Sequence, residues 1–257
     1  MTLHPVLEDT DAAVELVARY YSGEAKYGLP RSGSHFDHWG GGGDRQEIRN
    51  ELTSDDFLAV SFLYVNVPPE AAIALLGEQK HDVDALLREI PHDKHLSDLS
   101  KQEFKEYMGP ESSAQQLWDL LTRKHLYKWD IGATIASKIL ARKRPKLIPI
   151  TDKLVGDLVG RQGDYWLQWY TALTDGSNLK GRLNTIKKEA GIEQDPTPLR
   201  VLDVILWMHA SDLEWAKRKK ATEARVQRRV TSRIDAVESD EVPTSRALLA
   251  HRKGADQ

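Results

Sequence analysis

The segment 199–209, LRVLDVILWMH, most restricts how this chain can fold, because it is apolar almost all round. A helix with apolar side chains on every face must be surrounded by other elements. We therefore expect a buried central helix here, with a globular domain packed around it.

Apolar residues elsewhere also recur at helical spacing. This spacing predicts further helices over residues 10–22, 55–65, 70–76, 83–90, 134–141, 165–173 and 179–190, and one that Ser112 caps together with Gln115. Alternating patterns and hairpin-turn dipeptides, which would indicate strands, are sparse. With 257 residues and 40% hydrophobic content the chain can bury a sizeable core. We predict an all-α fold, a helical bundle of two packed lobes.

Residues 126–160 combine several features that suit phosphate binding. Gly132 lies in a turn before the helix 134–141, a basic Pro-interrupted link follows, and Asp152 stands at the start of another helix. Residues 121–161 contain ten Lys and Arg against three Asp, in a chain whose net charge is −3. A glycine turn, a helix N-terminus and a local excess of positive charge all favour contact with a phosphate.

This order of parts resembles the helix-hairpin-helix superfamily of DNA glycosylases, in which a hairpin, a Pro-containing loop and a catalytic aspartate follow one another. Residues 128–132, Lys-Trp-Asp-Ile-Gly, fill the hairpin turn, with Asp130 where the family has its first glycine. Asp152 falls on the position of the essential aspartate. Bifunctional members carry a lysine nucleophile two residues after the last hairpin glycine, where this chain has Thr134. The resemblance implies a monofunctional enzyme.

Such an enzyme hydrolyses the N-glycosidic bond of a damaged or modified base in double-stranded DNA and leaves an abasic site. The resemblance implies that Asp152 is catalytic, stabilising charge at C1′ and positioning water after the base has been flipped out. It assigns DNA contacts to the turn, the hairpin helix and the basic link: Ile131, Gly132, Ala133, Thr134, Lys138, Arg142, Lys143, Arg144, Lys146 and Lys153. No cofactor is implied, apart from a monovalent cation that the turn backbone binds in some members. Base-excision repair and defence against modified phage DNA are both open roles.

Each feature also has a simpler interpretation. Asp152 could only cap the helix that follows it, and the basic run could be a solvated face. The chain would then be a non-catalytic helix-hairpin-helix DNA-binding protein. A third class is an interaction protein that uses the acidic region 70–119, where 11 acidic residues face five basic ones.

The stretch 27–44, YGLPRSGSHFDHWGGGGD, has six glycines and cannot form a regular element. Its aromatic and basic side chains suggest a base pocket made of Tyr27, Arg31, His35, Phe36, His38 and Trp39. The alternative is a surface loop whose aromatic residues plug onto the core. His35 and His38 flank Asp37, but no cysteine or nearby third histidine completes a site, so we predict no metal.

The composition changes near residue 211. We divide the chain into a glycosylase-like domain of residues 1–210, with the hairpin at 112–142 and the catalytic-aspartate loop at 143–160, and a basic helix with a flexible tail at 211–257. Ser211 and Glu214 have the spacing of a capping box, which predicts a new helix there. The basic helix could follow the DNA backbone or be merely solvated. We expect a cytoplasmic protein, because the chain has no cysteine, no signal-peptide pattern and no apolar run that would span a membrane. We also expect it to be a monomer.

Overall fold

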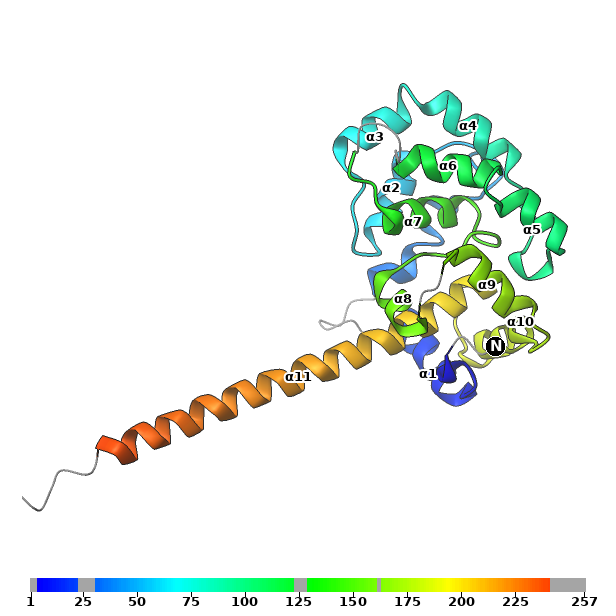
Figure 1. Cartoon of the computed structure of the whole chain (residues 1–257). Helices are drawn as coiled ribbons and strands as arrows, with labels where there is room; N and C mark the ends of the chain where they lie inside the picture. Colours follow the sequence, from blue (N-terminus) through cyan, green and yellow to red (C-terminus); the bar gives the residue numbers. More distant parts are fainter. Residues whose placement is uncertain (1–3, 23–30, 123–128, 161–162, 241–257) are drawn as a thin grey trace, which may run out of the picture. The chain divides into compact units, whose positions relative to one another are not determined.

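The computed structural model describes residues 4–22, 31–122, 129–160 and 163–240. These ranges form α-helices and short 3-10 turns without a β-strand, so the all-α prediction is confirmed (Figure 1). The helices are α1 (Thr10–Tyr21), α2 (Ser54–Ser61), α3 (Pro69–Leu76), α4 (Lys80–Glu89), α5 (Lys101–Met108), α6 (Ser113–Thr122), α7 (Ala133–Lys143), α8 (Lys153–Val159), α9 (Tyr165–Thr174), α10 (Leu179–Glu189) and α11 (Pro198–Asp240). In the described ranges no helix is both long enough and apolar enough to cross a bilayer.

The chain divides into two compact units, Met1–Ser211 and Asp212–Gln257. Within the first unit the helices form two groups (Figure 1). The first group is made by α2 to α7, in which α2 packs on α7, and α6 packs on both α4 and α7. The second group is made by α1, α9 and α10.

The start of α11 is the buried helix that the sequence predicts. Leu202, Val204, Ile205 and Leu206 are fully buried. The two charged residues in the stretch 199–209, Arg200 and Asp203, are also buried. Because a buried charge requires a partner, these two become important below.

Several helix ends differ from the sequence prediction. The side chain of Asp9, one residue before the predicted start, caps α1 by accepting a hydrogen bond from the Ala12 amide at 3.0 Å. Helix α2 begins after Thr53, which forms a capping box with Asp56. It ends at Ser61, short of the predicted 65. Ser112 does cap α6, since its hydroxyl accepts from the Gln115 amide at 3.1 Å.

The predicted helix start at Ser211 is wrong. Helix α11 runs without interruption from Pro198 to Asp240, so Ser211 lies in its interior. The capping pattern at 211–214 is overridden because the residues on both sides favour helix strongly. Helix α11 continues to Asp240, and residues 241–257 lie outside the described ranges.

Candidate functional site

The turn before α7 is described from Trp129 onward. Gly132 is the N-cap of α7, exposed and extended, and contributes no side-chain cap to the first amides of the helix. Asp130, which stands where the family has its first glycine, takes a left-handed φ of 59°. Aspartate tolerates this conformation better than most residues. Trp129 ties the turn to α6 by donating its indole N–H to the Leu121 carbonyl at 2.6 Å.

The turn residues divide by exposure. Ile131 is buried, whereas Ala133 and Thr134 are half-buried beside the exposed Gly132. The amides of the first turn of an α-helix have no intrahelical acceptor and point outward along the axis. The helix-hairpin-helix motif itself remains a proposal, because residues 123–128, which join α6 to the turn, lie outside the described ranges.

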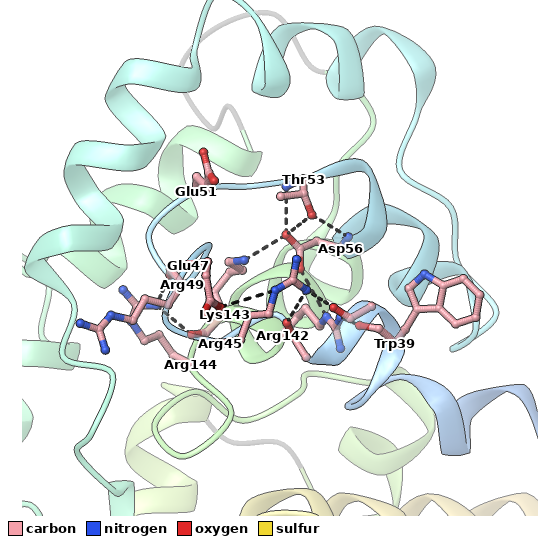
Figure 2. A network of polar contacts seen from close by, with 12 residues as sticks. Trp39, Arg45, Glu47, Arg49, Glu51, Thr53, Asp56, Arg142, Lys143 and Arg144 are labelled. Carbon is pink, nitrogen blue, oxygen red and sulfur yellow. Dashed lines mark hydrogen bonds and ion pairs between the residues drawn. The ribbon is translucent and has the colours of Figure 1, made fainter.

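The three consecutive basic residues Arg142, Lys143 and Arg144 are not on the surface. All three are buried, with 2%, 0% and 1% exposure. Figure 2 shows Arg142 and Lys143 meeting the carboxylate of Asp56, which accepts from Arg142 Nε at 3.3 Å and from Lys143 Nζ at 3.0 Å. Asp56 is itself fully buried. The prediction that these three residues contact DNA phosphates is therefore wrong, because their charges are already used inside the protein.

Arg144 is held by oxygens from other segments. Its guanidinium donates to the carbonyls of Ile90 at 2.8 Å and Arg49 at 2.6 Å, and to the side-chain oxygen of Asn50 at 2.8 Å. Burial, with a smaller contribution from the nearby positive charge of Arg49, lowers the pKa of Arg144 to about 10. The guanidinium still carries its charge at neutral pH, so it acts as a structural clamp between α7 and the loop 45–52.

The other predicted DNA-contacting lysines lie in three environments. Lys138 is buried, with 3% exposure. Lys146 is half-buried, and Lys153 is exposed and pairs with Asp157. The positive patch counted from the sequence is consequently smaller at the surface, since four of its ten basic residues are inside the protein.

Asp152 has two roles at once. Its Oδ1 accepts a hydrogen bond from the Leu154 amide at 2.8 Å and so caps α8. Its Oδ2 lies 3.7 Å from Lys138 Nζ, and the side chain is 18% exposed. The preceding residue is fixed from α7, because the Thr151 amide donates to Ser137 Oγ at 2.9 Å. The carboxylate thus caps α8 through Oδ1, has Lys138 beside Oδ2, and belongs to a residue that lines a cavity.

That cavity is a pocket in the first unit, and it is mixed in character. Its wall is made by Tyr20, Arg31, Gly33, Phe62, Leu63, Tyr64, Lys138, Ile150, Asp152, Arg200, Asp203, Val204 and Trp207. The enclosed volume is about 30 Å³, which is room for water and not for a nucleobase. The lining combines aromatic residues with charged ones, a mixture that is usual in ligand sites.

Lys138 joins Asp152 to the turn that contains Leu63. Its Nζ donates to the Leu63 carbonyl at 3.0 Å while it faces Asp152. Burial lowers the pKa of Lys138, and the negative charge of Asp152 acts against this shift. The lysine therefore does not reach the surface, and its position lets it orient Asp152.

The pocket rim carries a strained residue. Tyr64 has a φ of 60° and is 77% exposed. A left-handed conformation is unfavourable for a bulky side chain and often marks functional segments. Phe62, two residues earlier, packs edge-on against Trp39 with ring centroids 5.1 Å apart.

Arg200 and Asp203 form the polar pair of the buried helix. The Arg200 guanidinium donates to Asp37 at 3.1 Å, to the Tyr20 hydroxyl at 2.6 Å and to the carboxylate of Asp203. Burial raises the pKa of Asp203 to about 6, against the opposing effect of the Arg200 charge, and the negative charge of Asp152 adds to the rise. The sequence analysis did not select this pair, although two charged residues inside an otherwise apolar helix were a usable signal.

The predicted base-pocket loop contributes little of what was expected. Arg31 lines the pocket, and Tyr27 lies outside the described ranges. Phe36 is buried in the core and lies under the guanidinium of Arg200, 5.3 Å from its ring centroid, so its assignment to a base pocket is wrong.

The three other residues predicted for the base pocket, His35, His38 and Trp39, do not line this pocket. His35 and His38 are exposed, and Trp39 donates its indole N–H to Asp55 at 3.3 Å. The aromatic wall is formed instead by Tyr20, the 62–64 turn and Trp207. Within the described ranges no group of three or more His, Asp or Glu side chains could hold a metal ion.

Residues 13–210 match the model of a protein family that is described as a family of unknown function (DUF6308). The chain belongs to this family. No curated protein and no solved structure matches the chain. The matched range contains every residue that lines the pocket, from Tyr20 to Trp207. The DUF6308 region thus coincides with the first compact unit and excludes the basic end of α11.

Proposed function

We propose that this protein is a monofunctional DNA glycosylase with Asp152 as its catalytic carboxylate. The observation that carries the proposal is the placement of Asp152, which lines a pocket with several aromatic residues while its Oδ1 is fixed by the backbone of α8. A carboxylate with no access to a cavity could only cap its helix. One that is anchored and open to a pocket can also act on a bound molecule.

The chemistry follows from this placement. As the N-glycosidic bond breaks, positive charge develops at C1′ of the sugar, and a fixed carboxylate beside it lowers the barrier. The cavity beside Asp152 has room for the water that attacks C1′. Lys138, 3.7 Å away, keeps the carboxylate in position. Thr134 offers no amine at the family position for a lysine nucleophile, so water is the nucleophile and no cofactor is required, although the turn backbone could bind a monovalent cation.

DNA would be held through the surface around the turn before α7. The unpaired first-turn amides of α7 and the exposed Gly132 suit a phosphate. Lys146 and Lys153 are the predicted cations that retain solvent access. The second unit has a basic surface of its own on the end of α11, where Lys219, Lys220 and Arg225 are exposed. Phosphate contacts of this kind raise affinity without reading the sequence.

A flipped base would enter past the 62–64 turn. The enclosed volume of about 30 Å³ is too small for a base, so the rim must move when the base enters. Tyr64 is the candidate for this movement, since it is 77% exposed and in a strained conformation. Once displaced, the ring could stack on the base, a contact that tolerates many base types.

A non-catalytic DNA-binding protein is the second candidate. The observation that favours it is the hydrogen bond from the Leu154 amide to Asp152, which gives the carboxylate a structural role. In this account the turn grips phosphate and the pocket has no substrate.

The two candidates are separated by alkali-induced strand cleavage. Purified protein is incubated with DNA containing alkylated, deaminated or oxidised bases, and with phage DNA containing modified cytosines. We expect abasic sites from one of these substrates. The identity of that substrate distinguishes base-excision repair from defence against phage DNA. We propose that the enzyme acts as a monomer in the cytoplasm. DNA binding without abasic sites on any substrate would favour the second candidate.

A further inference from the structure

The pocket contains a second carboxylate that the catalytic account has not used. Asp203 lines the same cavity as Asp152 and is 7% exposed. Its Oδ2 is held by Arg200, while no described residue donates a hydrogen bond to its Oδ1. An unpartnered oxygen on a buried side chain at a cavity wall is available to a bound molecule.

Within the described ranges, Asp203 shares the one cation with which it forms an ion pair, because Arg200 also pairs with Asp37. Ion pairs join three carboxylates, Asp37, Asp152 and Asp203, to only two cations, Arg200 and Lys138. A buried carboxylate in excess over its cations is neutralised most easily by a proton. The charged or titratable groups around Asp203 are Arg200 on its own helix, Tyr20 and Tyr21 on α1, Arg31, Asp37, Lys138 on α7, and Asp152.

Among the three carboxylates, Asp203 is the one that we expect to hold the proton. It is buried more deeply than Asp152, and burial raises its pKa to about 6. A carboxyl group whose pKa is raised by burial can act as the proton donor in a site that also contains a second carboxylate. A donor with a pKa near neutral pH combines a usable protonated fraction with a usable driving force.

Given the glycosylase function proposed above, we propose that Asp203 is a second catalytic residue, the general acid that protonates the departing base. As the C1′–N bond breaks, its electron pair goes to the base, and the Asp203 O–H donates a proton to an acceptor atom of that base. Water forms the new bond to C1′ and gives a proton to Asp152. The products are the neutral base and the abasic sugar, and exchange with solvent returns the proton from Asp152 to Asp203.

The test is the pH dependence of base release in single-turnover reactions. The wild-type rate should fall about tenfold per pH unit on the alkaline side, because deprotonated Asp203 cannot act as the acid. Asp203→Asn should lower the rate by about 10²-fold to 10⁴-fold at its maximum and abolish this alkaline limb. Asp203→Glu should restore part of the rate and part of the alkaline limb. A purely structural role of Asp203 would not predict this recovery.

Asp37→Asn is the matched control. Asp37 shares Arg200 with Asp203 but does not line the pocket. Its removal leaves Arg200 paired with Asp203 alone, so the alkaline limb should remain and move to lower pH. This measurement also serves if Asp203→Asn does not fold.

The outcomes are distinct. An active wild type whose alkaline limb persists unchanged in Asp203→Asn overturns the role of Asp203 and leaves the glycosylase proposal intact. An alkaline limb that Asp37→Asn leaves in place without a shift also counts against Asp203. A wild type that releases no base from any substrate overturns both.

Discussion

Replacing Asp56 by asparagine should strongly destabilise the first unit. Asp56 is fully buried and accepts from Arg142 Nε at 3.3 Å, Lys143 Nζ at 3.0 Å and the Thr53 amide at 2.9 Å. Asparagine can keep one oxygen for Thr53, but it leaves two buried cations without a counter-charge. Breaking a buried ion pair by removing one partner costs about 3–5 kcal/mol. For a domain of this size that corresponds to a fall in Tm of roughly 6–20 °C.

The assay is urea denaturation followed by circular dichroism. Asp195→Asn is the matched control, since it removes the same charge from a side chain that is 87% exposed and paired with Lys187. An exposed pair contributes at most about 1 kcal/mol. A loss below about 1 kcal/mol in Asp56→Asn would refute the buried arrangement and revive the surface interpretation of the basic run.

A double-mutant cycle sharpens this test. Lys143→Met alone removes one of the two cations that pair with Asp56. The double variant Asp56→Asn/Lys143→Met should lose less free energy of unfolding than the sum of the losses in the two single variants. Residues in direct contact show coupling energies of about 0.5–3 kcal/mol. Additive losses would mean that the two side chains do not form the ion pair.

Three further predictions follow from the pocket and from α11. Folding raises the pKa of Asp203 from 3.8 to about 6, so the folded state binds this proton more tightly than the unfolded state. As the pH rises from about 4 to 7, the free energy of unfolding of the wild type should therefore fall by about 3 kcal/mol relative to that of Asp203→Asn. A pH-independent difference in denaturation free energy would contradict this. Tyr64→Gly should leave stability unchanged or raise it by about 1 kcal/mol through relief of backbone strain, and should weaken base release; a loss of stability would show that the ring is packed. Glutamine at Lys217, Lys219, Arg225 and Arg228 should reduce the slope of log affinity for DNA against log salt by up to about 4, and an unchanged slope would exclude this segment from binding.

Helix positions could be predicted from the sequence because apolar spacing is a local property. The buried aromatic row of α9, with Tyr165, Trp166, Trp169 and Tyr170, lies where the 3.6-residue period predicts it. The break at Ser211 was wrong for a related reason, since a capping pattern is equally local and has no information about the strength of the helix on both sides.

The destination of charged side chains could not be predicted in this way. Arg142 meets Asp56 across 86 residues of chain, and a charge count along the sequence does not contain such a contact. The same applies to Phe36, which the loop composition suited equally to stacking on a base or to plugging the core. Asp152 was selected from its order in the motif, and its access to the pocket became visible only when α7, α11 and the 62–64 turn were placed around it.

The most direct test of Asp152 measures released base and bound DNA in the same reaction. Wild type and Asp152→Asn are compared on the substrate identified by strand cleavage, since asparagine remains a good N-cap and should preserve α8. The account predicts one free base per abasic site for the wild type, and for Asp152→Asn a similar affinity for DNA with no detectable base release. Base release by Asp152→Asn at the wild-type rate would contradict it.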